Sequence, residues 1–249
     1  MKLQEKVAIV TGGGSGIGEA ICRRMAREGA SVIIADIDLV RADNVAKEIR
    51  EGHSRAIAVQ LDVTKSAEAN QVVEAVIKDF GKLDILVNNA GVSHPNVNVP
   101  FSQSTEEMWD WTIAVNLKGV RNCTRAAINH MIERKYGKIV NIASIAGIRG
   151  TITKADYSAA KGGVIGFTKA LAKEVAPYGI NVNSVLPGPT ATPLFLSNTK
   201  EKQEYFVQGT YLKRAAKPEE IANMVVFLAS DEAGFAVGQN FIIDGGKSL

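Results

Sequence analysis

A tyrosine and a lysine four residues apart are the side chains in this sequence best suited to proton transfer. Tyr157 and Lys161 stand in the segment YSAAK, and residues i and i+4 share one face of a helix. A phenol with a pKa of about 10 is a poor base at neutral pH, but a nearby ammonium group favours the phenolate and lowers that pKa. The spacing alone is weak evidence, because such pairs also occur on solvated helices.

The second chemical feature is the glycine-rich segment VTGGGSGIGEA at residues 10–20, which follows an apolar run and precedes a helical pattern. Such a turn lets the backbone approach a phosphate, whose negative charge the N–H groups of the next helix attract. The pattern GxxxxGK[ST] fails because Glu19 and Ala20 follow the last glycine. The pattern GxGxxG fails too, which leaves TGxxxGxG from Thr11 to Gly18. A glycine-rich turn without a ligand is the alternative interpretation.

The spacing TGxxxGxG resembles that of the short-chain dehydrogenase/reductase family, and the resemblance extends over the whole chain. It implies that a tyrosine is the general acid and base, a serine binds the substrate oxygen, a lysine assists the tyrosine and contacts the nicotinamide ribose, and an asparagine holds a water of the proton relay. The catalytic residues that the resemblance implies are Ser144, Asn116, Tyr157 and Lys161. The other motifs that carry it are LDV at 61–63, NNAG at 88–91, PGPTATP at 187–193 and IDGG at 243–246.

An acidic residue at the end of the second strand-like run indicates which cofactor is used. Asp36 lies roughly 20 residues after the glycine loop, where a carboxylate accepts hydrogen bonds from both adenosine ribose hydroxyls and repels a 2′-phosphate. Ser15 and Ile37 supply no countercharge at positions where NADP-using relatives often carry basic residues, so we expect NAD. A helix cap is the alternative role for Asp36, but Asp38 can fill it. The resemblance implies a cofactor site of Gly12, Ser15, Gly16, Ile17, Gly18, Asp36, Ile37, Asp62, Val63, Asn89, Ala90, Gly91, Tyr157, Lys161, Pro187, Gly188, Thr190 and Thr192, with the two threonines at the nicotinamide carboxamide.

Substrate contacts are expected from the segments around the tyrosine and from a lid. Lys154, three residues before the tyrosine, and Arg149 are candidate partners for an acidic group on the substrate, although loop lysines are usually just solvated. His94 and Phe195 can reach the pocket, but a polar loop histidine and a lid anchor are equally good interpretations. We expect a secondary alcohol or ketone as substrate and no metal.

The elements that position these residues alternate between short β-branched runs and longer helical patterns. Nearly unbroken apolar strands are buried on both faces of a sheet, which requires crossover helices and parallel strands. We expect one Rossmann-type α/β domain over residues 1–249, a doubly wound parallel sheet of about seven strands with helices on both faces. A lid is expected at about 189–217, the long stretch without clear periodicity. The predicted strands are 6–12, 31–36, 56–63, 82–89, 137–144, 180–188 and 240–246, and the predicted helices are 17–28, 38–51, 66–79, 105–134, 156–177 and 218–230.

The composition disfavours several classes of partner. The net charge of +3 comes from 29 basic and 26 acidic residues scattered along 249 positions, which is a poor pattern for nucleic acid or a membrane surface. No apolar stretch approaches the roughly 18 residues of a membrane span, so we expect a cytoplasmic protein. Cys22 and Cys123 lack metal or disulfide spacing, and buried thiols are expected.

Two expectations concern assembly and the alternative function. The segments 105–134 and 156–177 resemble the helices through which relatives form dimers and tetramers, so a homotetramer or homodimer is expected by resemblance. The alternative to an enzyme is a non-catalytic NAD-binding regulator or structural relative, which would keep the glycine loop and Asp36 but lose the tyrosine or the lysine. This chain keeps both.

Overall fold

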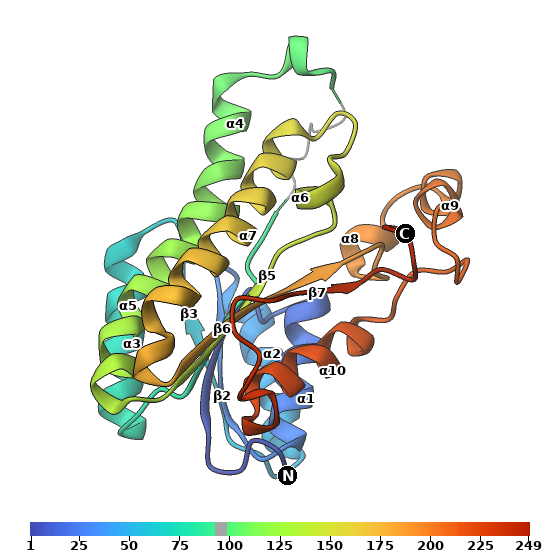
Figure 1. The fold of residues 1–249 in the computed structure, drawn as a ribbon. Coiled ribbons are helices and arrows are strands. Elements are labelled where there is room, and N and C mark those ends of the chain that lie inside the picture. The colour runs from blue at the N-terminus through green and yellow to red at the C-terminus, as the bar shows by residue number, and fades with distance from the viewer. Residues whose placement is uncertain (93–98) are drawn as a thin grey trace.

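A computed structural model describes residues 1–92 and 99–249, and in this part of the chain seven strands form one parallel sheet (Figure 1). The strand order is β3-β2-β1-β4-β5-β6-β7. Because β1 lies between β2 and β4, the chain reverses its winding direction beside β1, where such sheets bind ligands. The predicted doubly wound fold is confirmed. The strands are β1 Val7–Thr11, β2 Ser31–Asp36, β3 Ala56–Gln60, β4 Ile85–Asn88, β5 Gly137–Ile142, β6 Ile180–Pro187 and β7 Asn240–Ile243.

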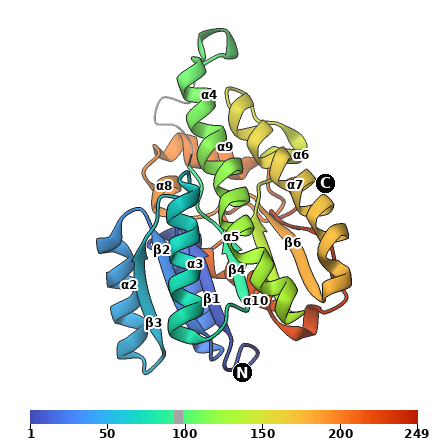
Figure 2. The same ribbon diagram turned by 90° about the vertical axis from the view of Figure 1, so that its left-hand side faces the viewer.

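Helices cover both faces of the sheet, as Figures 1 and 2 show. Alternate residues of a strand point to opposite faces, so Val10 and Ile34 lie in one apolar cluster while Ile9 and Ile33 lie in the other. Both clusters are buried, which explains why the strands read as continuous apolar runs. On the first face lie α1 Gly16–Arg27, α2 Leu39–Glu51 and α10 Pro218–Ala229, and on the second lie α3 Ser66–Phe80, α5 Gly119–Arg134 and α7 Ala155–Val175.

The predicted helix at 105–134 contains an irregular turn. It consists of α4 Glu106–Ile113, a π-helical turn Ala114–Lys118 and then α5. A single π-helical turn inside an α-helix is rare and often marks a functional site. Here the turn carries Asn116, one of the four predicted catalytic residues.

The predicted lid is partly helical rather than irregular. It contains α8 Pro193–Leu196 and α9 Lys200–Gln208, whose first turns are capped by the side chains of Thr192 and Thr199. These helices are too short to show a clear period in the sequence. The remaining short elements are α6 Ala146–Arg149 and the 3₁₀ turns Phe101–Gln103, Ala176–Tyr178 and Asp231–Ala233.

Both cysteines are buried free thiols, as predicted. Burial raises the pKa of Cys22, and it raises the pKa of Cys123 to about 12, so neither thiol is a reactive nucleophile at neutral pH. Among the helices in residues 1–92 and 99–249, none has the length and apolar character needed to cross a membrane.

Candidate active site

The glycine loop after β1 is packed so closely that side chains are excluded. A Cβ atom on Gly18 would lie 2.0 Å from the carbonyl oxygen of Gly12, and one on Gly12 would lie 2.9 Å from the Cα of Ala90. The side-chain nitrogen Nδ2 of Asn89 donates to the carbonyl oxygens of Thr11 and Gly12, each at 3.0 Å. Asn89 therefore holds the loop in place with its side chain.

The start of α1 fits a phosphate group. Ser15 occupies the N-cap position in extended backbone, and its hydroxyl makes no capping hydrogen bond. Ile17 lies in the first turn, where backbone N–H groups have no intrahelical acceptor and attract anions. A Cβ on Gly16 would lie 3.1 Å from Cγ2 of Thr192, so this turn lies directly against the start of the predicted lid.

Asp36 at the end of β2 ties the glycine loop to the second strand. Its Oδ2 accepts from the backbone N–H of Gly14 at 2.9 Å, and its Oδ1 accepts from Asp38 at 3.0 Å. Asp38 accepts from the N–H of Arg41 and caps α2, so the capping role belongs to Asp38, as predicted. The half-buried Asp36 lies beside the exposed Ile37.

A hollow of about 460 Å³ begins at Ile37, next to Asp36. Its volume lies within the range of small-molecule pockets and suits the adenosine end of a dinucleotide. Thr64 donates its N–H and hydroxyl to Asp62 at 3.0 and 2.7 Å. Burial opposes ionisation of Asp62, but these bonds and the charge of Lys65 hold its pKa below the usual value. The carbonyl oxygen of Val63 accepts from Asn122. The hollow is lined by Ile37, Gln60, Asp62, Lys65, Glu68, Gln71 and Val72.

The structure brings Ser144, Tyr157 and Lys161 together. Tyr157 lies in the first turn of α7, and Nζ of the buried Lys161 lies 5.7 Å from the centre of its ring. Lys161 Nζ also donates to the carbonyl oxygen of Ile142 at 2.9 Å. Ser144 follows β5 directly, accepts from the N–H of Ala146 at 3.1 Å, and hydrogen-bonds with the Tyr157 hydroxyl.

Asn116 reaches the same point from the π-helical turn. It is fully buried, and its amide nitrogen donates to the carbonyl oxygens of Val92 and Thr112 at 2.8 and 3.0 Å. A Cβ on Gly91 would lie 3.0 Å from Asn116 Oδ1 and 3.2 Å from Lys161 Nζ. The predicted quartet of catalytic side chains therefore converges, and the water held by Asn116 stays a prediction.

Burial dominates the pKa shifts of the Tyr157–Lys161 pair. Burial raises the pKa of Tyr157 above its usual value, although the hydrogen bond with Ser144 works in the opposite direction. Burial also lowers the pKa of Lys161 to about 8. Burying both groups disfavours both charged forms, and the predicted lowering of the tyrosine pKa by Lys161 stays a prediction.

Sequence reasoning missed a bridge between α4, which directly precedes the π-helical turn, and α7. The hydroxyl of Thr112 donates to Asp156 Oδ2 at 2.8 Å, and Asp156 Oδ1 accepts from the N–H of Tyr157 at 2.7 Å. Thr112 thus contacts both Asn116 and the residue before the tyrosine. The only sequence signals are an acidic residue directly before Tyr157 and a threonine four residues before Asn116.

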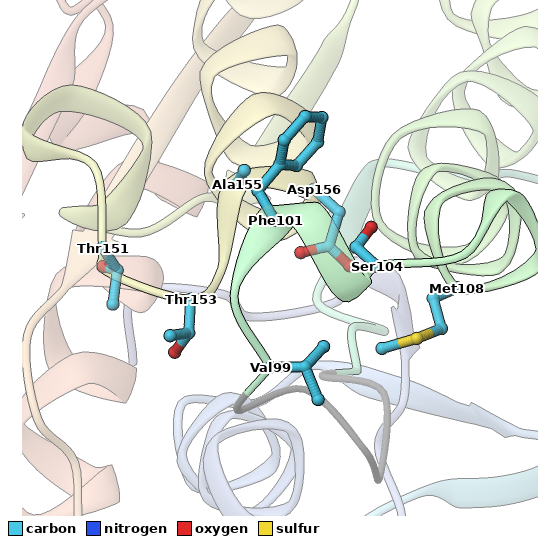
Figure 3. Close-up of a pocket in the computed structure, with 8 residues that line it drawn as sticks. All are labelled: Val99, Phe101, Ser104, Met108, Thr151, Thr153, Ala155 and Asp156. Carbon is cyan, nitrogen blue, oxygen red and sulfur yellow. The ribbon is translucent and has the colours of Figure 1, made fainter.

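A small cavity of about 80 Å³ opens beside Asp156 (Figure 3). It is smaller than a usual small-molecule pocket, so it does not identify the substrate. Its lining residues are Val99, Phe101, Ser104, Met108, Thr151, Thr153, Ala155 and Asp156.

The loop after β6 is shaped by its own hydroxyl groups. Gly188, which follows Pro187, donates its N–H to Ile243, and a Cβ on it would lie 2.8 Å from the Cα of Asp244. Thr190 donates to the carbonyl oxygen of Gly188, and Thr192 accepts from the N–H of Phe195. The contacts of these threonines with a carboxamide stay a prediction.

The predicted substrate residues differ in their positions. Lys154 is half-buried at the N-cap of α7, whereas Arg149 is exposed at the end of α6. The ring of Phe195 packs against Phe206 with centroids 6.2 Å apart, so it anchors α8 to α9 within the lid. His94 lies outside the described residues.

Comparisons with known proteins agree with this geometry. The family model described as Enoyl-(Acyl carrier protein) reductase matches residues 12–248. The 3-oxoacyl-[acyl-carrier-protein] reductase FabG of Thermotoga maritima is 42% identical over 246 residues, which cover 99% of each chain. The (2S)-[(R)-hydroxy(phenyl)methyl]succinyl-CoA dehydrogenase subunit BbsD of Thauera aromatica is 39% identical, covering 100% of this chain and 99% of the relative. The cis-4-hydroxycyclohexanecarboxylate dehydrogenase of Sinomonas cyclohexanicum is 39% identical, covering 97% and 96%. The chain therefore belongs to the short-chain dehydrogenase/reductase family of oxidoreductases, which use a nicotinamide cofactor.

Proposed function

We propose that this protein interconverts a secondary alcohol and a ketone with NAD as its cofactor. The observation that carries the proposal is the convergence of Ser144, Tyr157 and Lys161 beside the glycine loop. The test is an absorbance screen of NAD and NADP reduction across neutral and acidic secondary alcohols. Reduction of NAD by at least one alcohol supports the proposal, and tight NADH binding without activity on any alcohol or ketone favours the non-catalytic alternative.

Tyr157, Ser144 and Lys161 have different roles in the proposed reaction. The chemistry that NAD supplies when bound is the acceptance or return of a hydride. Tyr157 takes the proton of the alcohol, or donates it to the ketone oxygen in the reverse direction. Ser144 donates a hydrogen bond to that oxygen as negative charge develops on it. The contact of Lys161 with Ile142 fixes its amine beside the tyrosine ring.

The glycine loop and the carboxylate of Asp36 support the proposed binding of NAD. Gly12 and Gly18 let the loop pack tightly against Asn89 and Ala90, and the N-terminus of α1 that follows it would attract the pyrophosphate. Asp36 and the hollow along Ile37 and Asp62 fit the adenosine. The carboxylate of Asp36 favours ribose hydroxyls over a 2′-phosphate, so we propose NAD rather than NADP.

Replacing Asp36 with alanine is expected to weaken the preference for NAD. The variant loses a charged acceptor for the ribose hydroxyls, and hydrogen bonds to charged groups contribute about 1.5–3 kcal/mol, so kcat/KM for NAD should fall about 10- to 100-fold. NADP should be used comparatively better, because the repulsion of its phosphate is removed. Steady-state kinetics with both cofactors measure the ratio.

Asp43→Ala is the matched control, because it removes an exposed carboxylate from α2 that pairs with Arg50 at 3.5 Å. Its cofactor ratio should equal that of the wild type. Since Asp36 also accepts from Gly14, the melting temperature of each variant is measured alongside. An unchanged NAD/NADP ratio in a folded Asp36→Ala variant would disprove the role of this carboxylate.

The two reaction directions are expected to respond differently to pH. Because burial raises the pKa of Tyr157, the phenol is protonated at pH 6–8 and ready to donate its proton to a ketone. Reduction should therefore be nearly constant across that range, whereas oxidation needs the deprotonated phenol and should rise about tenfold per pH unit. Initial rates in both directions, at constant ionic strength and saturating cofactor, test this. Oxidation that slows as the pH rises would contradict the assignment of Tyr157 as base.

The expected homotetramer or homodimer stays a prediction. Exposed apolar side chains at the edge of the sheet support it, because Phe235 is fully exposed and Ile242 of the edge strand β7 is 44% exposed.

A further inference from the structure

Two half-buried lysines lie at the mouth of the site without acidic partners. Lys154 stands at the N-cap of α7, three residues before Tyr157, and Lys202 lies on α9 of the lid. Among the residues that the structure describes, neither ammonium group donates a hydrogen bond or lies within 4.0 Å of a carboxylate. Partly burying an ammonium group without a partner costs free energy, so this pair calls for an explanation.

Other lysines of low exposure in the described chain are matched with an acceptor. Lys138 donates to Asn181 at 2.7 Å, and Lys161 donates to the backbone of Ile142 at 2.9 Å. Lys247 donates to the carbonyl oxygen of Phe206. The lysines at the mouth of the site are therefore exceptions to the pattern of the rest of the protein.

Lys202 faces inward from the lid. It lies one helical turn before Phe206, and both residues are half-buried, whereas Glu201 and Glu204 on the same helix are exposed. Phe206 packs on Phe195, which fixes this face of α9. Figure 1 shows α8 and α9 at the same end of the sheet as α6 and the start of α7.

The charges of Lys202 and Asp156 both act on Lys154. Burial lowers the pKa of Lys154, and the charge of Lys202 lowers it further, while the charge of Asp156 opposes both effects. Asp156 does not form an ion pair with Lys154, since its oxygens accept from Thr112 and from the N–H of Tyr157. Two ammonium groups against one carboxylate leave a net positive charge here, which an anion would neutralise.

We propose that Lys154 and Lys202 together bind a carboxylate carried by the substrate itself, so that the substrate is a hydroxy acid or the corresponding keto acid. This inference rests on the proposed alcohol–ketone interconversion. Lys154 and Tyr157 both lie at the start of α7, only three residues apart, so the anion that we propose is one close to the reacting carbon. A phosphate on a thioester carrier would lie at the far end of a long arm, so the carboxylate is the better fit. An anion held by both lysines also links the lid to α7.

The test compares charged and neutral substrates in matched variants. Oxidation rates are measured for hydroxy acids with the hydroxyl two, three or four carbons from the carboxylate, and for their methyl esters. The enzymes are the wild type, Lys154→Met, Lys202→Met and the control Lys200→Met, whose side chain is exposed at the start of α9. We expect the acid-to-ester ratio of kcat/KM to fall about 10- to 100-fold in the first two variants, mainly through KM, and to stay constant in the control.

Three results would overturn the carboxylate site. They are equal rates for acids and esters in the wild type, a Lys154-dependent preference for a coenzyme A thioester over the free acid, and a raised NADH dissociation constant in Lys154→Met. If no alcohol is oxidised at all, the proposed function fails, and calorimetric titration of the NADH complex with malonate decides the site separately. Malonate binding that is at least tenfold weaker in Lys154→Met than in Lys200→Met supports the carboxylate site, and equal malonate binding in the two variants rejects the site.

Discussion

Replacing Tyr157 with phenylalanine is expected to lower kcat by about 10²- to 10⁴-fold, the usual contribution of a positioned acid or base. The hydroxyl of Tyr157 is the group that carries the proton to and from the substrate oxygen. Among the described residues, no other side chain forms a hydrogen bond with the hydroxyl of Ser144, whose other partner is the backbone N–H of Ala146. The ring remains to pack beside Lys161, so the NADH dissociation constant should change little. Stopped-flow or steady-state rates, with fluorescence titration of NADH, measure both quantities.

Tyr178→Phe is the control for this substitution. Tyr178 is 44% exposed in the 3₁₀ turn that follows α7, and losing its hydroxyl should leave kcat unchanged. Normal turnover by Tyr157→Phe would refute the assignment of the general acid and base. A large loss of NADH affinity would show instead that Tyr157 serves mainly to bind the cofactor.

Gly18→Ala is expected to disrupt the cofactor cradle. The new methyl group would lie 2.0 Å from the carbonyl oxygen of Gly12 and 2.5 Å from the side chain of Asn89, so the loop must move. Overpacking of this kind costs about 1–3 kcal/mol. If that strain falls on the loop, the affinity for NADH should drop roughly 10- to 100-fold. Titration of NADH fluorescence measures the loss.

Gly166→Ala separates this effect from the general consequences of adding a methyl group. Gly166 lies in α7 with nothing within 4 Å of its Cβ position, and alanine in a helix is more stable than glycine by about 0.5–1 kcal/mol. This control should bind NADH normally and melt no lower than the wild type. Equal NADH affinity in the Gly18 and Gly166 variants would show that the loop does not hold the cofactor.

Most of the fold could be predicted, because strands that are buried on both faces of the sheet appear in the sequence as unbroken apolar runs. Ile33 and Ile34 face opposite apolar clusters, so β2 reads as an unbroken apolar run and predicts a parallel sheet. The ends of strands were less predictable. The run 56–63 was predicted as one strand, but β3 ends at Gln60, which leaves Asp62 and Val63 beyond the carboxyl end, the edge at which such sheets generally bind ligands.

The irregular elements could not be predicted, because their causes are tertiary. The π-helical turn at Asn116 occurs where the side chain bonds the backbone of Val92, a residue 24 positions away. The lid helices α8 and α9 each span fewer than ten residues, which is too short to establish a period. Their caps at Thr192 and Thr199 are visible only in the structure.

In the candidate site too, some features could be predicted from the sequence and others depend on the folded structure. The four candidate catalytic residues were predicted from motifs, and their side chains converge in the structure. The effect of burial, which raises the pKa of Tyr157, could not be predicted from residue spacing. The bridge from Thr112 to Asp156 and the effect of the Lys202 charge on the pKa of Lys154 both connect segments that are far apart in the sequence.

The most direct measurement follows a deuterium atom from the substrate. A secondary alcohol that the screen identifies is labelled at its carbinol carbon and incubated with NAD and the wild-type protein. Mass spectrometry of the products should show one deuterium in each NADH formed and an equal amount of unlabelled ketone. NADH bound tightly without transfer of deuterium, or ketone formed without labelled NADH, would contradict hydride transfer at this site.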